Sequence, residues 1–270
     1  MRVELRQKIV KLPLIHMLSW HIVNMGNHYF YSKWSRKNQT EQFWKTLIKK
    51  RKTDECFIIG NGPSLSVNDL ILLKGKDCFV SNGFYKIQNQ LNFQPKYYVV
   101  QDRYCMSDEV VNQIKAECIL FGDYFWRTHN ISVSNAFCFP TKRSIGKDVI
   151  SFGNCYSQII DAYTVTFSMI QIAVTIGYKK ICLLGIDHDY PFTYDEKGNV
   201  VRNFDVRSHF YEGEQPDSFI CNVEGMNRAY ICAKKYADEH GLEIVNCTRG
   251  GKLEVFSRRT LEDVLHVNKG

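Results

Sequence analysis

The chain has 270 residues, of which 44% are hydrophobic and 23% are charged, and this composition excludes a globally disordered protein. Its ten cysteines form no C-x-x-C pair, so we expect reduced thiols in a cytoplasmic protein rather than disulfides or a zinc site. The net charge of +7 is uneven. Residues 1–52 carry 12 Lys or Arg and 2 Glu, a net of +10, whereas the other 218 residues carry 23 basic and 26 acidic side chains, a net of −3.

The first 52 residues are predicted to form a basic, aromatic, helical extension that contains three of the four tryptophans. No signal peptide is visible, and the apolar stretch 12–23 is too short and too often interrupted by polar residues to span a bilayer. Two interpretations stay open. The aromatic side chains either pack on the rest of the protein, or they lie at an anionic membrane surface.

From Cys56 onward the pattern is that of an α/β protein. The expected strands cover residues 56–60, 77–83, 95–102, 117–123, 135–140, 179–187 and 242–248. The expected helices cover residues 66–75, 157–177 and about 222–240, and Gly177 is placed as a C-terminal cap. The strands are continuously apolar, which is typical of a mostly parallel sheet covered on both faces. We predict one Rossmann-like domain over residues 53–270, with helices on both faces of the sheet.

The first strand runs into an unusual loop, Gly60-Asn61-Gly62-Pro63-Ser64. The loop is neither a P-loop nor the G-x-G-x-x-G dinucleotide fingerprint, which disfavours a nicotinamide-dependent redox enzyme. A tight turn would explain it. A close approach to a nucleotide would explain it too, because the Asn61 amide suits a base or ribose and nearby backbone N–H groups suit phosphate.

Other strands also end in an amide or a carboxylate: these residues are Asn82, Asp102, Asp123 and Asp187. Turn chemistry alone favours Asn and Asp at such positions. However, ligands of open α/β sheets bind outside the carboxyl ends of the strands. Together with Asn61, these residues predict a polar pocket at that edge of the sheet.

The segment after Asp187 adds candidates for phosphate and metal binding. Asp187 and Asp189 form a D-x-D pattern, which many nucleotide-sugar enzymes use to hold a divalent cation against a diphosphate, although such patterns also arise by chance. Tyr190 and Tyr194 can each donate a hydrogen bond to a phosphate oxygen. His209 follows in a polar segment; it is either an ordinary solvent-exposed histidine or a base for an attacking hydroxyl.

Several segments together resemble a known group of transferases. "IIGNGPSL", "SNGFY", "AVTIGYKKICLLGID" and "SHFY" occur in the order seen in bacterial sialyltransferases that use CMP-activated sialic acid. The chain also resembles the MptE-like domain of archaeal 6-hydroxymethylpterin diphosphokinases and motility-associated flagellin glycosylation factors. In that domain a Gly-x-Gly-Pro-Ser-Leu strand exit precedes a "GxxxIxLxGxD" strand. The late "GGKLEVFSRRTLEDVL" is similar to the end of this group, so the resemblance covers roughly residues 55–262.

The resemblance implies roles for individual residues. Asn61 and Ser64 would contact the nucleotide, Asn82 would lie beside it, and Tyr190 and Tyr194 would lie at its phosphate. From the pattern of the loop and the strand ends, without the resemblance, we add Gly60, Gly62 and Asp102 to the expected nucleotide site. The two tyrosines would steady the phosphate leaving group, and His209 would be the general base. The sialyltransferases have Thr-Ser-Gly at the start of the long helix, whereas this chain has Thr164-Val165-Thr166. The donor-contacting serine and glycine are therefore missing, and the identity of the sugar and nucleotide stays open.

We therefore expect a cytoplasmic glycosyltransferase of surface-glycan assembly, which transfers a sugar, with a sialic-acid-like sugar as one candidate, from a nucleotide donor to a carbohydrate hydroxyl. Its partners would be the donor, a glycan acceptor and, through residues 1–52, an anionic membrane, but not nucleic acid. One alternative is a diphosphokinase acting on a small alcohol such as a hydroxymethylpterin, with Asp102, Asp187 and Asp189 available as Mg²⁺ ligands. Another is a non-catalytic nucleotide-binding module.

Overall fold

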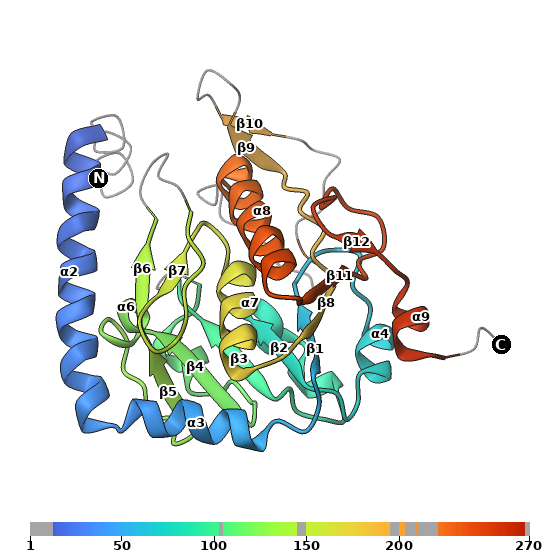
Figure 1. Cartoon of the computed structure of the whole chain (residues 1–270), viewed down its shortest axis with the longest axis horizontal. Helices are drawn as coiled ribbons and strands as arrows, with labels where there is room; N and C mark the ends of the chain where they lie inside the picture. The colour runs from blue at the N-terminus through green and yellow to red at the C-terminus, as the bar shows by residue number, and fades with distance from the viewer. Residues whose placement is uncertain are drawn as a thin grey trace.

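The computed structural model describes residues 13–102, 105–144, 150–194, 200–202, 209 and 221–267, apart from the side chains of 13–17, 192–194 and 202. Its centre is an eight-stranded sheet with the order β12-β11-β8-β1-β2-β3-β4-β5, and all of its neighbouring strands are parallel (Figure 1). The chain starts in the middle at β1, builds outward to β5, and then crosses back to β8. The reversal of strand order therefore lies between β1 and β8, where such sheets form ligand crevices.

The seven predicted strands are present. The strands of the sheet are β1 (Glu55–Ile59), β2 (Cys78–Ser81), β3 (Tyr97–Val100), β4 (Cys118–Gly122), β5 (Ala136–Phe139), β8 (Lys180–Leu184), β11 (Glu243–Asn246) and β12 (Ser257–Arg258). The continuous apolar runs are explained by burial on both faces: in β1, Ile58 belongs to the apolar cluster on one face of the sheet, and Phe57 to the cluster on the other. The predicted α/β fold is confirmed.

Helices cover both faces of the sheet (Figure 1). One face packs against α3 (Thr40–Lys50), α7 (Val165–Ile176) and α8 (Val223–Glu239). The other face packs against α4 (Val67–Leu72), α5 (Asp108–Val111), α6 (Asp123–Trp126) and α9 (Leu261–Leu265), together with the 3₁₀ turn η1 (Asn82–Lys86). A second short turn, η2 (Gln88–Gln90), follows. Gly177 ends α7 with φ 98°, in the left-handed conformation that a C-terminal glycine cap adopts.

The prediction of one helix over residues 157–177 is wrong in its first part. Residues Ile159–Asp161 form strand β7, which pairs in parallel with β6 (Thr141–Arg143). The side chain of Thr164 then caps α7 by accepting a hydrogen bond from the Thr166 N–H at 3.2 Å. β-branched Ile159 and Ile160 favour a strand, but they stand next to a helical apolar run, and the apolar pattern alone does not separate the two elements. A hairpin of β9 (Phe192–Tyr194) and β10 (Val200–Arg202) was also missed.

The N-terminal segment forms α2 (Pro13–Lys37) and α3, which run beside and below the edge of the sheet formed by β5 (Figure 1). The ring of Phe43 stacks on Phe137 of β5, and Trp34 meets the same ring edge-on with centroids 4.9 Å apart. Trp44 is 1% exposed and belongs to the apolar core. These aromatic side chains therefore pack on the rest of the protein. Helix α3 contributes Trp44 and Leu47 to the same apolar core as residues after position 53.

The ten described cysteines are all free thiols, and most of them are buried. Within the described residues, no helix combines the length and the apolar character needed to cross a bilayer.

Candidate functional site

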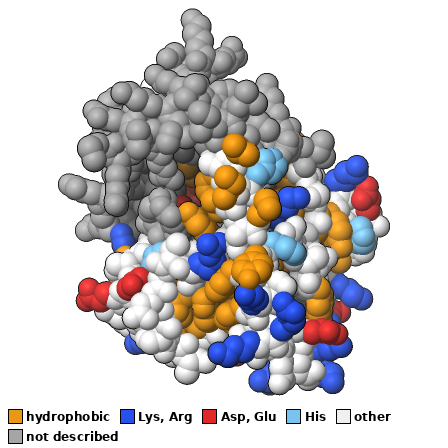
Figure 2. All heavy atoms as spheres, turned by 90° about the vertical axis from the view of Figure 1, so that its left-hand side faces the viewer, with side chains coloured by type: hydrophobic (Ala, Val, Ile, Leu, Met, Phe, Trp, Pro, Cys, Tyr) orange, Lys and Arg blue, Asp and Glu red, His pale blue; other side chains and the backbone are white. Residues whose placement is uncertain are grey.

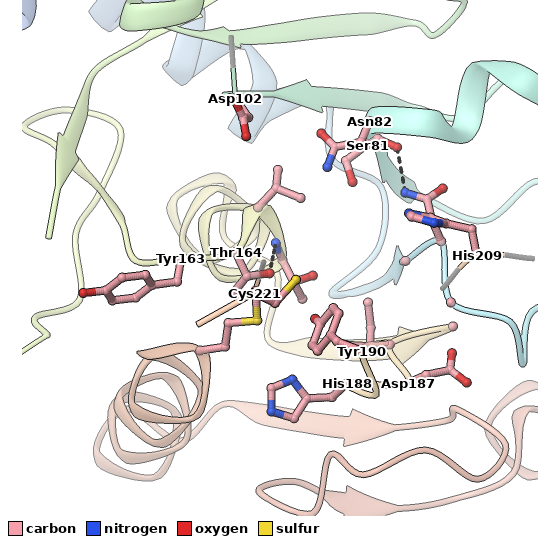
Figure 3. Close-up of a pocket in the computed structure, with 18 of the residues that line it drawn as sticks. Ser81, Asn82, Asp102, Tyr163, Thr164, Asp187, His188, Tyr190, His209 and Cys221 are labelled. Atoms are coloured by element: carbon pink, nitrogen blue, oxygen red, sulfur yellow. Dashed lines mark hydrogen bonds between the residues drawn. The ribbon is translucent and has the colours of Figure 1, made fainter. Parts of the chain in front are cut away.

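A cavity of about 230 Å³ lies at the carboxyl ends of β1, β2, β3 and β8. It is therefore at the reversal of strand order, as the sequence predicts for this fold class. Figure 3 shows Asn82 and His209 on one side of it, Tyr163 and Thr164 on another, and Tyr190 with His188 below. Its wall combines residues from strand ends, from the start of α7 and from α8, which are far apart in the sequence.

The two glycines of the opening loop are explained by contact with the exit of β8. A Cβ atom on Gly60 would lie 2.3 Å from the carbonyl oxygen of Gly185, and one on Gly62 would lie 1.9 Å from Oδ2 of Asp187. The N–H groups of Gly60 and Gly62 donate to the carbonyls of Leu184 and Gly185 at 2.8 and 2.9 Å. The loop therefore packs directly against the residues that follow β8, and it leaves no open turn around a ligand.

This packing limits which backbone N–H groups of the loop could meet a phosphate. The Ser64 N–H donates to Oδ1 of Asp187 at 3.2 Å, and Pro63 has no N–H. The N–H groups of both glycines are also hydrogen-bonded to protein carbonyls. The N–H of Asn61 is therefore the main backbone donor that the loop could direct at a phosphate. A phosphate would have to be met mainly by side chains or by other elements.

Asn61 and Asn82 present unpaired amide oxygens at the cavity. Nδ2 of Asn61 donates to the carbonyl of Ser81 at 3.1 Å, which fixes the amide, while Oδ1 of each asparagine is buried without a hydrogen-bond partner among the described residues. Asn82 also has a backbone φ of 48°, a left-handed conformation that asparagine tolerates better than most residues. Buried oxygens of this kind are matched by a ligand that donates hydrogen bonds, such as the amino group of a base or the hydroxyls of a ribose.

Ser64 and the two carboxylates proposed for a metal are engaged with protein groups. Oγ of Ser64 donates to Oδ2 of Asp187 at 2.8 Å, and Ser64 does not line the cavity. Burial raises the pKa of Asp187, and the hydrogen bonds from Ser64 oppose that rise. Asp189 instead forms an ion pair with Lys252 at 2.9 Å. No cluster of three or more metal-ligating side chains occurs in the described part of the chain, and the proposed metal site stays a prediction.

Tyr190 lines the cavity, and burial raises the pKa of its hydroxyl well above the usual value. The hydroxyl therefore keeps its proton and can donate a hydrogen bond to an anionic ligand. Tyr194 lies in β9, and its side chain is outside the described residues. Its expected phosphate contact stays a prediction.

His209 also lines the cavity. Burial, with a smaller contribution from the positive charge of Lys86, lowers the pKa of its imidazole to about 4. The ring is therefore neutral at physiological pH, as a general base requires, but it is a weaker base than an ordinary histidine of pKa about 6.5. A negatively charged ligand bound beside it would raise that pKa.

His188 is a second histidine at the cavity. Its Nε2 lies 2.8 Å from Oδ1 of Asn227, so Nε2 carries the hydrogen and Nδ1 the lone pair. Nδ1 is buried and has no partner among the described residues, and burial lowers the pKa of the ring. Its backbone φ of 54° places it, like Asn82, in the left-handed region. Such strained residues are frequent at functional sites.

The sequence interpretation missed one wall of the cavity. Gln101 and Asp102 follow β3, and Nε2 of Gln101 donates to Oδ1 of Asp161 in β7 at 3.0 Å. Arg143 of β6 lies 3.8 Å from Oδ2 of Asp161. Burial raises the pKa of Asp161, while Arg143 lowers it and Asp102 raises it. Oε1 of Gln101 is buried and unpaired among the described residues, so this wall too is rich in acceptors. Of the residues in this wall, only Asp102 was predicted, because no sequence pattern indicates that β6 pairs with β7.

The start of α7 forms another part of the cavity that was not predicted in detail. Tyr163 has φ 65°, and its ring lies over Gly225 of α8, where a Cβ atom would come within 2.4 Å of the ring. Tyr163, Thr164 and Thr166 all line the cavity. The N-terminal end of α7 therefore faces the space where a ligand would lie.

One strand-end carboxylate has a different role. Asp123 is fully buried away from the cavity and accepts hydrogen bonds from the N–H and the hydroxyl of Thr141. Burial raises its pKa to about 6. Of the residues expected at the polar edge, Asn61, Asn82, Asp102 and Asp187 line the cavity, and Asp123 joins β4 to β6 instead.

No family model and no curated protein matches the chain. The solved structures that match it include the following two. A structure of the MAf glycosyltransferase from Magnetospirillum magneticum AMB-1 is 12% identical, covers 78% of this chain and has a TM-score of 0.47. The match spans only 35% of that protein. The monofunctional α-2,3-sialyltransferase Cst-I from Campylobacter jejuni is 20% identical, with 73% of this chain and 76% of that chain covered and a TM-score of 0.39. Similarity at this level does not assign the chain to a family.

Proposed function

We propose that the protein is a glycosyltransferase that binds a nucleotide-activated sugar and transfers the sugar to a hydroxyl group. One observation carries the proposal: the unpaired oxygens of Asn61 and Asn82 face a cavity at the point where the strand order reverses. Nucleotides bind at this position in open α/β sheets, and their base and ribose supply hydrogen-bond donors. The asparagines would thus hold the nucleoside.

The wall of Gln101, Asp102 and Asp161 supports a sugar as the transferred group. Oε1 of Gln101 and the carboxylates of Asp102 and Asp161 are acceptors, so they suit the hydroxyls of a carbohydrate. The carboxylates of Asp102 and Asp161 would repel a carboxylate on the sugar, unless the Arg143 side chain turns from Asp161 toward the ligand. This arrangement favours a neutral or amino-bearing sugar over a sialic acid.

In the proposed reaction, the acceptor oxygen attacks the anomeric carbon while the bond from that carbon to the phosphate oxygen breaks. The phosphate leaves with the bonding electron pair, and the hydroxyl of Tyr190, which keeps its proton, would donate a hydrogen bond to it. His209, neutral at physiological pH, would take the proton of the acceptor hydroxyl. His188 is the second candidate for this role because its unpaired Nδ1 carries a lone pair.

A diphosphokinase needs Mg²⁺ bound by carboxylates and phosphates. Here the carboxylate of Asp187 is held by Ser64, and that of Asp189 is paired with Lys252. These contacts would have to open before both carboxylates could meet one cation. The geometry therefore favours transfer of a sugar over transfer of a pyrophosphoryl group.

The test is a thermal-shift screen of CMP, CDP, UDP, GDP and ATP, each with and without Mg²⁺, followed by incubation with the sugar derivatives of the nucleotide that binds. We expect one nucleotide to raise the melting temperature without Mg²⁺, since a ligand at a hundredfold excess over its Kd stabilises by about 2.7 kcal/mol. Its sugar derivative should then lose its sugar to an acceptor alcohol. Stabilisation by ATP alone, and only with Mg²⁺, would overturn the proposal in favour of a diphosphokinase.

A further inference from the structure

An exposed row of apolar side chains runs along α2. Leu18, Ile22, Met25 and Tyr29 are between 61% and 73% exposed, and their spacing of four, three and four residues places them on one face of the helix. We call them the α2 stripe. Figure 2 views this side of the molecule and shows hydrophobic side chains gathered there, with Lys, Arg and His side chains nearby. Single exposed apolar residues are ordinary, but an aligned set of them marks an interaction surface.

The packing of α2 on the body does not use the stripe. The opposite face carries the contacts: Trp20 meets Tyr124 edge-on, Asn27 accepts a hydrogen bond from Arg127 at 2.7 Å, and Trp34 packs on Phe137. The helix is therefore apolar on two sides. Only one of them is explained by the fold.

The charge of the helix indicates what the stripe contacts. Residues 13–37 include no Asp or Glu, and Lys33, Arg36 and Lys37 follow the stripe as exposed side chains. Downstream, α3 exposes Lys45, Lys49 and Lys50. Apolar side chains in a row with adjacent cations are the features by which a helix lies in the interface of a membrane with anionic lipids. A second copy of the chain is a poorer partner, because its α2 would bring the same cations and no carboxylate.

We propose that the α2 stripe, with the cations that follow it, docks the protein on an anionic membrane surface, with α2 lying in the plane of the interface. The same helix is joined to the cavity. Arg143, which lines the cavity, lies over the ring of Trp20 at 4.3 Å, and its backbone N–H and carbonyl are both bonded to the Asn24 side chain. Docking through α2 would thus hold the cavity at a fixed position relative to the membrane. Only the use of that position, to reach an acceptor carried by a lipid, rests on the proposed function.

The experiment is flotation of the full chain with vesicles of phosphatidylcholine alone and of phosphatidylcholine with about 30% phosphatidylserine. The wild type should bind the anionic vesicles, and the double variant Ile22→Asp/Met25→Asp should lower the partition coefficient at least about tenfold. Ile231→Asp is the matched control, because Ile231 is 57% exposed on α8, away from the stripe. It should bind as the wild type does. Replacing Lys33, Arg36 and Lys37 by Gln should remove the preference for phosphatidylserine.

Three outcomes would overturn the docking proposal. One is that the wild type does not bind anionic vesicles. Another is that the double variant binds anionic vesicles as strongly as the wild type does. A wild-type dimer in analytical ultracentrifugation that becomes a monomer in the double variant, without vesicle binding, would assign the stripe to a second copy of the chain. Melting temperature and nucleotide binding, measured on every variant, show that the fold and the cavity are intact. Failure of nucleotide binding in all proteins would affect the proposed function and leave the docking result unchanged.

Discussion

Gly62 and Asp187 are in contact such that no side chain fits between them: a Cβ atom on Gly62 would lie 1.9 Å from Oδ2 of the aspartate. The same carboxylate accepts hydrogen bonds from the N–H and the hydroxyl of Ser64. Asp187 is held from the other side by the loop after β11, where the N–H of Lys252 donates to its carbonyl at 2.7 Å. The residues that follow β1 and β8 are therefore held together by close packing and hydrogen bonds. Gly62 and Asp187, which both line the cavity, are fixed in position by these contacts.

Gly62→Ala should destabilise the protein. The backbone of Gly62 is not in the left-handed region, so the cost comes from overpacking against Asp187, at about 1–3 kcal/mol of unfolding free energy. Urea denaturation followed by circular dichroism measures the change. Ser64→Ala is the comparison, because it removes the hydrogen bond to Asp187 without adding an atom and should cost about 1 kcal/mol. An alanine variant at Gly62 as stable as the wild type would mean that the two strand exits are not held together by this close packing.

Trp44→Ala tests whether the N-terminal segment belongs to the core. Trp44 is 1% exposed beside Phe43 and Phe137, so its truncation should cost about 3–5 kcal/mol of stability. Tyr29→Ala is the control, since Tyr29 is 63% exposed on α2 and its loss should leave the melting temperature nearly unchanged. By the same reasoning, deletion of residues 1–52 should expose Phe137 and the apolar face that α3 covers, and cause aggregation. A stable, monomeric 53–270 fragment would show that the extension is a separate unit.

The low pKa of His209 should be visible in the dependence of stability on pH. Its folded pKa of about 4 lies below the value of about 6.5 for an unfolded histidine, so between these values the unfolded chain binds more protons. This group therefore makes the protein less stable as the pH falls from about 6.5 toward 4, and the effect is complete below 4. His209→Asn should flatten the slope in that window. NMR titration of labelled histidines gives the midpoint directly, and a value near 6.5 for His209 would contradict its burial.

The sequence was sufficient to predict the sheet and the edge at which the cavity opens. Buried parallel strands appear as continuous apolar runs, and their ends carry polar residues wherever the chain turns. Asn61, Asn82 and Asp102 could be identified in this way. Asp123 could not be separated from them, because an aspartate that bonds Thr141 has the same local sequence context as one that faces a ligand.

The far wall of the cavity depends on contacts between distant segments. Arg143 and Asp161 come together only because β6 pairs with β7, and three-residue strands leave almost no periodic signal. Tyr163 enters the cavity through a left-handed backbone conformation, which the sequence does not reveal for a tyrosine. The close contact of Gly62 with Asp187 could not be predicted either, because the sequence does not distinguish a glycine needed for a turn from one needed for a close contact.

The central claim is that Asn61 and Asn82 bind the nucleotide, and isothermal titration calorimetry on three alanine variants tests it most directly. Asn61→Ala and Asn82→Ala should each weaken binding of the nucleotide found in the screen by about 1–3 kcal/mol, or roughly 5- to 150-fold, because each removes an acceptor. Asn135→Ala is the matched control. Asn135 also donates through Nδ2 to a backbone carbonyl, that of Ala116 at 2.8 Å, but it lies outside the cavity, so affinity should not change. Wild-type affinity in both cavity variants would contradict the account.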